Sequence, residues 1–435
     1  MPRTRKPQGK PRLREAERNQ LELREYSLDS LLPEGHRARV LWELVGKLDL
    51  RAFYDAIEAR EHTPGHPATD PKILLTLWLF ATAEGVGSAR QLERLCTRDN
   101  AYRWICGGVS TNYHTLADFR VAHGDKLDGL LTRLLAVLMK EELIDLHRVA
   151  QDGVRVRANA GASSFRRRKT LEECLAEAKE QVDALRAELD EDPSASSNRE
   201  KAARERAARE RLEAIERALE EMPKVEETKK RNPPKKDRDG NRKKTTEARV
   251  STTDSEARVM KMGDGGWRPA YNMQFGTDTE SRFVLAVAVT NIGNDGEQMV
   301  PMLEQVERRI GLCPHDWLVD GGFVNLGQID KVEGWGISVY APVPTPRNPE
   351  IDPYLPKKDD TKNVARWRKR MGTENAKEIY KERAATAETV HADLRRWRGL
   401  QQIPVRGSPK ALCIALLHAL TYNLLRWHSV QPAAV

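Results

Sequence analysis

The order of hydrophobic and polar residues divides the chain into a helical first part and a later part in which strands alternate with helices. Apolar residues recur at helical spacing over residues 21–145. Asp70 and Pro71 suit the N-cap and first turn of one helix, and Ser88 with Gln91 fits the capping box of another. Short helices joined by glycine turns fit a helix-turn-helix, and an ordinary helical bundle fits equally well.

Residues 146–158 replace this pattern with a short run of alternating apolar residues. Asp152 and Gly153 interrupt the run. A lone Asp-Gly pair is more often a turn than an active site, because both residues suit hairpin geometry. The alternation nevertheless predicts a strand that delivers one acid, so the importance of Asp152 depends on whether later acids lie beside it.

Residues 170–222 carry a third pattern, with apolar residues alternately four and three positions apart on both sides of a Pro/Ser segment, 192–197. This spacing predicts an antiparallel helical hairpin, which extends with a basic loop to residue 250. The loop includes residues 229–244, which are rich in lysine, arginine and helix breakers. Such a run is either a solvated loop or a segment that lies along phosphates, and both interpretations stay open.

Strand patterns return after residue 251. Residues 271–278 and 282–290 alternate regularly and predict a β-hairpin. The predicted elements that follow are a helix from about 295 to 310, a strand 316–320, a helix 325–332, a strand 336–341, a Pro- and Lys-rich loop 342–363, and helices from about 373 to 397 and 409 to 427.

Composition and charge narrow the class of protein. Lysine and arginine total 73 against 65 acids, a formal net charge of +8, and residues 1–20 read as a disordered basic arm or a solubilising tail. The five cysteines stand far apart, which favours neither a zinc finger nor a disulfide framework. No stretch approaches the roughly 20 apolar residues of a membrane span, so we expect a cytoplasmic, nucleoid-associated protein with no membrane contact.

The order of these elements is that of a ribonuclease H-like α/β core, for which we predict a mixed five-stranded sheet flanked by helices. Its two parts would be residues 146–169 and 251–428, followed by a tail, 429–435. In this arrangement the first strand is central, the fourth pairs beside it in parallel, and a helix after the fifth packs across both. Three acids that are distant in sequence, Asp152, Asp320 and Glu388, would then meet at one edge of the sheet.

Carboxylates at such an edge suit phosphodiester cleavage. That reaction needs an activated oxygen nucleophile and stabilisation of a developing oxyanion, and two hard cations about 4 Å apart supply both. Mg²⁺ prefers oxygen ligands, which three acids would provide.

Other acids have local explanations. Asp254 lacks a convincing buried strand before it, so a turn or cap role is expected. Asp278 lies at the predicted hairpin turn, and Asp295 stands where a helix is expected to begin. Asp152 and Asp320 differ from these because each ends an apolar strand at the equivalent place.

The segment from Tyr380 through Arg383 and Glu388 to Arg395 resembles the C-terminal signature of bacterial insertion-sequence DDE transposases. In that signature a Tyr and an Arg precede the last catalytic Glu, and a basic residue follows it. Further motifs agree in order: Val149-Ala150-Gln151-Asp152-Gly153 with Ala158-Asn159-Ala160, Ala270-Tyr271-Asn272-Met273-Gln274 with Val289-Thr290-Asn291 and Asn294-Asp295, and Val319-Asp320-Gly321-Gly322-Phe323. The helical part from Asp70 to Arg120 is also similar to the domain that precedes the catalytic core in one branch of these enzymes.

Four positions, Ala270, Gly321, Phe323 and Arg395, depart from the family's pattern without removing a carboxylate. Gly321-Gly322-Phe323 stands where Ala-Gly-Tyr is expected, and Ala270 stands where a Gly is common. Arg395 replaces the usual Lys, which keeps the charge but changes the geometry of its hydrogen bonds.

The resemblance implies a transposase that binds terminal inverted repeats, cuts DNA at the element's ends and transfers the 3′ ends to target DNA. It implies that Asp152, Asp320 and Glu388 are catalytic and hold two Mg²⁺ ions, for which Mn²⁺ substitutes. The implied partners are double-stranded DNA and a second copy of the chain, because pairing two ends needs two active sites. The residues expected to contact DNA phosphates are Tyr380, Arg383, Arg395, Lys229, Lys230, Arg231, Lys235 and Lys236.

Two alternatives stay open. One is a metal-dependent nuclease of the same fold that cuts DNA without joining it. The other is a DNA-binding protein whose catalytic site has decayed. The helical hairpin also has two interpretations, since it would either contribute to a dimer or form a coiled coil within one chain.

Overall fold

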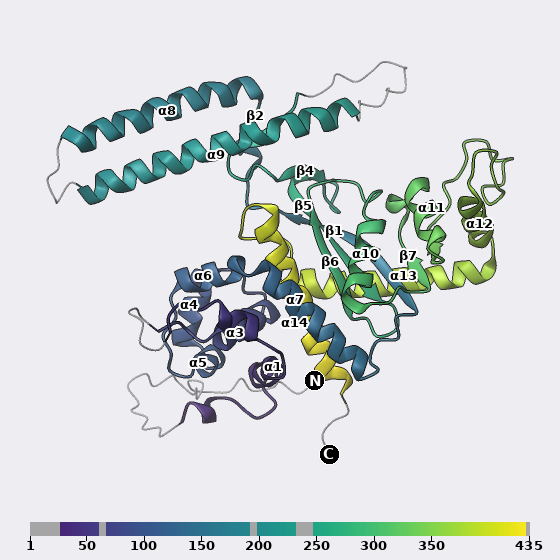
Figure 1. The fold of residues 1–435 in the computed structure, drawn as a ribbon, viewed down its shortest axis with the longest axis horizontal. Coiled ribbons are helices and arrows are strands. Elements are labelled where there is room, and N and C mark those ends of the chain that lie inside the picture. The colour runs from purple at the N-terminus through teal and green to yellow at the C-terminus, as the bar shows by residue number, and fades with distance from the viewer. Residues whose placement is uncertain (1–26, 61–66, 192–197, 232–246, 432–435) are drawn as a thin grey trace, which may run out of the picture.

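The computed structural model describes residues 27–60, 67–191, 198–231 and 247–431. The predicted basic arm and the predicted Pro/Ser segment, 192–197, lie outside these ranges. In the described part, a helical unit, a sheet with flanking helices and a long helical hairpin are joined (Figure 1). Among the described residues, no helix combines the length and the apolar composition needed to span a membrane.

The helical unit is built around α3 (Pro71–Ala83), in which almost every side chain is buried. Asp70 accepts a hydrogen bond from the Lys72 amide, and Ser88 accepts one from the Gln91 amide, so both predicted N-caps are confirmed. The other helices of this unit are α1 (Arg37–Gly46), α2 (Arg51–Asp55), α4 (Ala89–Arg98), α5 (Asn100–Cys106), α6 (Tyr113–Ala122) and α7 (Gly124–Lys140).

The sheet is organised around β1 (Arg148–Arg157), which is confirmed as its central strand. β1 pairs antiparallel with β5 (Trp267–Asp278) and, at its beginning, parallel with β7 (Asp316–Leu318). β8 (Ser338–Tyr340) continues the sheet in parallel beyond β7, and β6 (Val284–Thr290) pairs antiparallel with β5. The predicted β-hairpin and the predicted parallel pairing of the first and fourth strands are therefore both present.

The sheet has six strands rather than the predicted five, because β4 (Arg258–Lys261) pairs antiparallel with the beginning of β5. Only Met260 is buried in this four-residue strand, so its sequence shows no recognisable alternation. A second difference is α12 (Lys362–Met371), a helix that begins at the end of the predicted Pro- and Lys-rich loop. α10 (Met299–Ile310) begins later than predicted, and α11 (Leu326–Gly334) follows β7.

The hairpin consists of α8 (Arg168–Glu191) and α9 (Asn198–Arg231), which lie side by side and project from the sheet (Figure 1). Their apolar stripes pack against each other within the chain. A two-stranded sheet of β2 (Phe165–Arg166) and β3 (Val250–Ser251) joins the two ends of the hairpin, and an ion pair of 2.6 Å between Arg258 and Glu221 fixes it to β4.

Two C-terminal helices connect the units. α13 (Glu374–Ala392) packs on β1 and continues into a π-helical turn, η4 (Asp393–Trp397). α14 (Ser408–Val430) packs against β6 on one side and against α7 and α3 on the other. Its buried Asn423 accepts a hydrogen bond from the Val284 amide and donates one to the Val284 carbonyl, both 2.8 Å long. α14 therefore fixes the helical unit to the sheet.

Candidate active site

Asp152 lies in the middle of β1, opposite Phe275 of β5, and does not end the strand as predicted, because the pairing with β5 continues to Arg157. Because side chains alternate along a strand, Asp152 faces α13, whereas Gln151 and Gly153 face the opposite side. Gln151 donates a hydrogen bond to the Gln298 carbonyl at the beginning of α10, which confirms this orientation. β1 therefore presents one carboxylate to α13, the helix that carries Tyr380, Arg383 and Glu388.

Asp320 follows β7, the parallel neighbour of β1, and one of its oxygens accepts a 2.7 Å hydrogen bond from the Gly322 amide. A Cβ on Gly322 would lie 3.0 Å from that same oxygen, so the turn suits a residue without a side chain. Since parallel strands end at the same edge of a sheet, the turn brings Asp320 towards Asp152. The negative charges of Asp320 and of Asp295 both act on Asp152.

The electrostatic state of Asp152 reflects its surroundings. Burial raises its pKa to about 6, and the charges of Asp320 and Asp295 act in the same direction. The Arg383 guanidinium and a 2.8 Å hydrogen bond from the Gly153 amide oppose this rise. Burial therefore makes the ionised form of Asp152 less favourable than in water, and Arg383 and the Gly153 amide offset only part of this cost.

α13 supplies the side chains that face Asp152. Nη1 of Arg383 lies 3.3 Å from Asp152 Oδ2, and Nδ1 of His391 lies 3.8 Å from the same oxygen. Tyr380 lies beneath the Arg383 guanidinium, and its hydroxyl has a pKa that burial raises, with the charges of Asp320 and Asp152 adding to that rise. Two of the predicted DNA-contacting residues, Tyr380 and Arg383, are therefore at the acids.

His391 was not predicted from the sequence. Burial, together with the charges of Arg395 and Arg383, lowers its pKa to about 4, so its imidazole is neutral at pH 7. The effect of Arg395 on this pKa also places the Arg395 guanidinium near the site, although its side chain is exposed in the π-helical turn. His391 is recognisable in the sequence only once the phase of α13 is known.

Glu388 is not gathered with the other two acids. Tyr380, Arg383 and Ala387 have the i, i+3, i+7 spacing of one helix face, and Ala387 is buried on that face. Glu388 is one position further round the helix and is exposed. Among the described residues, no group of three His, Cys, Asp or Glu side chains is arranged to hold a metal ion.

Contrary to the prediction from the sequence pattern, Asp295 does not begin a helix. It does not cap α10, since the N-cap residue is Gln298, which makes no side-chain capping hydrogen bond. Its Oδ1 instead accepts hydrogen bonds from two side-chain amides of β5, those of Asn272 at 2.6 Å and Gln274 at 2.7 Å. Asp278 behaves as expected, accepting hydrogen bonds from Ser281 within the hairpin turn.

Asp254 begins a turn, as predicted, because its carbonyl accepts a hydrogen bond from the Ala257 amide, and its side chain is also buried. It accepts a 2.8 Å hydrogen bond from the Tyr271 hydroxyl and a 3.2 Å hydrogen bond from the Gly407 amide. These contacts tie β5 to the loop before α14. The buried Asp254 carboxylate therefore has a structural role in holding these two segments together.

The predicted basic tract is only partly described. Lys229, Lys230 and Arg231 end α9, where Lys229 donates to the Glu247 carbonyl and Arg231 pairs with Glu227. Lys235 and Lys236 lie outside the described residues. The described part of the tract belongs to the hairpin and not to the acid-bearing edge of the sheet.

The acids offer the kind of ligand that a hard cation takes. Mg²⁺ is commonly held by one or two protein carboxylates and completed by substrate phosphates and water, and Asp152 and Asp320 supply such a pair. The Asn272 side-chain oxygen lies beside Gly153, on the other face of the sheet from Asp152, and is not part of this pair. The donor set therefore fits a divalent cation whose coordination DNA would complete.

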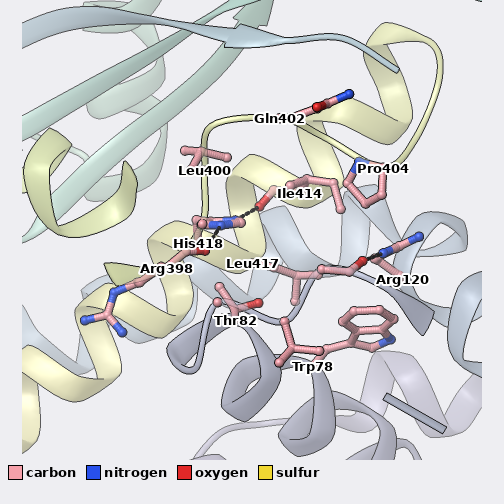
Figure 2. Close-up of a pocket in the computed structure, with 14 residues that line it drawn as sticks. Trp78, Thr82, Arg120, Arg398, Leu400, Gln402, Pro404, Ile414, Leu417 and His418 are labelled. Carbon is pink, nitrogen blue, oxygen red and sulfur yellow. Dashed lines mark hydrogen bonds between the residues drawn. The ribbon is translucent and has the colours of Figure 1, made fainter. Parts of the chain in front are cut away.

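A cavity elsewhere in the molecule differs from this site in its lining residues. Figure 2 shows that it lies between α3 and α14, with Arg120 of α6 at one side and the loop after η4 at the other. The Arg120 guanidinium lies 4.6 Å from the Trp78 ring centre and donates to the Gly87 carbonyl, while His418 contacts two backbone carbonyls. None of the described residues that line this cavity is acidic, so it offers no carboxylate to a cation. The cavity lies where the helical unit packs against α14.

Two family models match the chain. The model described as a transposase DDE domain matches residues 239–424, and the model described as a transposase domain (DUF772) matches residues 26–122. Asp320 and Glu388 fall within the first match, whereas Asp152 lies between the two. No curated protein and no solved structure matches the chain.

Proposed function

The chain belongs to the DDE transposases of insertion sequences, and on that basis we propose that it cuts DNA at the ends of a mobile element and joins the freed 3′ ends to target DNA. The observation that carries this proposal is the approach of Asp152 and Asp320 from two adjacent parallel strands, with Arg383 facing Asp152. Paired carboxylates beside a guanidinium suit a reaction on a phosphodiester.

Divalent cations are the second part of the proposal. Two Mg²⁺ ions, or Mn²⁺ in their place, would activate a water nucleophile and stabilise the developing oxyanion. Asp152 and Asp320 hold these ions, and Glu388 is the third acid. Because Glu388 lies on the exposed side of α13 in the free chain, its participation requires α13 to shift or turn when DNA is bound.

Phosphate binding is assigned to α13 and the turn after it. The Arg383 side chain donates to Asp152 through Nη1, and its Nε is buried without a hydrogen-bond partner, so this donor would reach a phosphate only after the side chain moves. A guanidinium with an unused donor is suited to a phosphate oxygen, because charge-assisted hydrogen bonds are the stronger ones. Arg383, Tyr380 and the exposed Arg395 therefore contact phosphates near the cut.

Recognition of the element's ends is assigned to the parts outside the sheet. The helical unit and the basic end of α9 would hold terminal inverted repeats, since lysine and arginine contacts to phosphates supply much of the affinity for DNA. Lys229, Lys230 and Arg231 of α9 would contribute to this binding, and the same role is proposed for Lys235 and Lys236, which lie outside the described residues. Two ends must be brought together, so a homodimer on DNA is proposed.

The test uses purified full-length protein, Mg²⁺ and the DNA that flanks its own gene. Wild type is expected to give both cut ends and joined products, and Asp152→Asn neither. Glu297→Gln, which removes an exposed acid near the site, serves as the matched control. Cutting without joined products would identify a nuclease, and binding of ends without cutting would identify a decayed enzyme. Equal cleavage by wild type and Asp152→Asn would overturn the assignment.

A further inference from the structure

We propose that Asp295 is a further acid of this site and that, together with Asp320, it holds a divalent cation. The inference rests on the proposed function, because it assigns a role towards the cations on which that function depends. It concerns the free chain, in which Glu388 is exposed and separate from the other acids.

The Asp295 carboxylate is held in one orientation. Its Oδ1 accepts hydrogen bonds from the side-chain amides of Asn272 and Gln274, two buried residues on the same face of β5. The Asp295 side chain is only 13% exposed, and no described residue donates a hydrogen bond to its Oδ2. Nη2 of Arg155 stays 3.9 Å from that oxygen, beyond hydrogen-bond distance. One oxygen is therefore fixed by hydrogen bonds, while the other has the ion pair with Arg155 and accepts no hydrogen bond from a described residue.

Asp295 Oδ2 and Asp320 approach one point. A Cβ on Gly322 would lie 3.5 Å from Asp295 Oδ2 and 3.0 Å from Asp320 Oδ1. Two carboxylates that come this close repel each other unless a positive charge lies between them. The glycine leaves open the space in which a cation would contact both.

A buried oxygen of Asn272 lies beside the fixed oxygen of Asp295. Asn272 is 1% exposed, yet its Oδ1 has no hydrogen-bond partner. That oxygen and Asp295 Oδ1 lie 2.7 Å and 2.8 Å from the position that a Cβ on Gly153 would occupy. A buried oxygen beside a carboxylate is unfavourable without a donor or a cation, and oxygen ligands are those that Mg²⁺ and Mn²⁺ prefer.

The test measures Mn²⁺ binding to the full-length chain without DNA, by electron paramagnetic resonance of the unbound ion. Asp295→Asn keeps an oxygen that can accept the two amides, so its expected effect is on the cation and not on the fold. We expect it to weaken binding by at least about tenfold. Glu297→Gln, an exposed acid two residues away, should leave binding unchanged.

A second pair of variants changes shape and no charge. Gly322→Ala places a methyl group between Asp295 and Asp320 and should also weaken Mn²⁺ binding. Gly321→Ala, whose methyl group would contact only Pro342 at 3.4 Å, should not. This pair keeps the inference testable even if Asp295→Asn fails to fold.

The outcomes separate the two proposals. Mn²⁺ binding that falls in Asp152→Asn and Asp320→Asn but is unchanged in Asp295→Asn and Gly322→Ala would overturn the role of Asp295 alone. A lower thermal midpoint in Asp295→Asn with Mn²⁺ affinity preserved would do the same, since Asp295 would then only tie its loop to β5. Unchanged Mn²⁺ binding in Asp152→Asn and Asp320→Asn would instead overturn the metal site of the proposed function.

Discussion

The Arg383 guanidinium lies 3.3 Å from Oδ2 of Asp152, a contact between α13 and the central strand of the sheet. Arg383 lowers the pKa of Asp152 against the effect of burial, which nevertheless keeps that pKa near 6. Burial makes the Asp152 carboxyl group costly to ionise, yet it must be ionised to bind a cation. The contact between Arg383 and Asp152 therefore links the fold to the proposed chemistry.

The first prediction concerns stability. A carboxyl group with a raised folded-state pKa stabilises the fold fully below its unfolded pKa, and that contribution is lost as pH rises through about 6. Asp152→Asn should therefore raise the free energy of unfolding at pH 7.5 by about 2–3 kcal/mol and change it little at pH 4. Urea unfolding without divalent cations at the two pH values measures this. The same gain at both pH values would contradict the assigned pKa.

The second prediction concerns Arg383. Arg383→Gln removes a positive charge that opposes protonation of Asp152, so the acidic limb of the cleavage rate against pH should move to higher pH by about one unit. Arg383→Lys should move it less, because the charge is kept. The exposed Arg396 of η4 gives the control variant, Arg396→Gln, which should leave the limb in place. An unshifted limb in Arg383→Gln would show that Asp152 does not set it.

The third prediction concerns Arg148, at the beginning of β1. Its guanidinium contacts Asp316 of β7 at 3.0 Å and Glu382 of α13 at 2.6 Å, so one side chain joins two strands and the helix. Arg148→Met leaves the buried Asp316 carboxylate unpaired and should lower the free energy of unfolding by about 3 kcal/mol. Glu382→Gln should cost less, since Glu382 is 44% exposed. A larger loss for Glu382→Gln would contradict this order.

The fourth prediction separates Glu388 from the acids of the sheet. Because Glu388 is exposed on α13, Glu388→Gln should leave Mn²⁺ binding by the free chain unchanged while abolishing DNA cleavage. The exposed Glu378 of the same helix, paired with Lys381, provides the control variant Glu378→Gln, which should retain cleavage. Full cleavage by Glu388→Gln would remove Glu388 from the proposed catalytic set.

Much of the fold followed from local pattern. β1, β7 and the β5–β6 hairpin are visible in the sequence because their buried residues alternate or run continuously. Asp152 and Asp320 could be paired because each lies on or just after a strand of predictable order. β4 could not be predicted, since a strand of four residues with one buried side chain carries no periodic signal.

The candidate site was less predictable, because its remaining parts depend on contacts across the sheet. Asp295 resembles the first residue of a helix, and only the pairing of β5 with β1 places Asn272 and Gln274 where they bind it. The position of Glu388 had a usable signal. Tyr380 and Arg383 fix the phase of the helix, and that phase directs Ala387, not Glu388, towards the sheet.

The most direct test of the central claim, that Asp152 and Asp320 act as one catalytic unit, is the single-turnover rate of DNA-end cleavage in Mg²⁺. It is measured for wild type, Asp152→Asn, Asp320→Asn and the double variant. Residues that act together give losses that do not multiply. We predict that each single variant loses at least about 10³-fold and that the double variant is no slower than the slower single one. Cleavage at the wild-type rate in either single variant, or losses that multiply in the double variant, would contradict the claim.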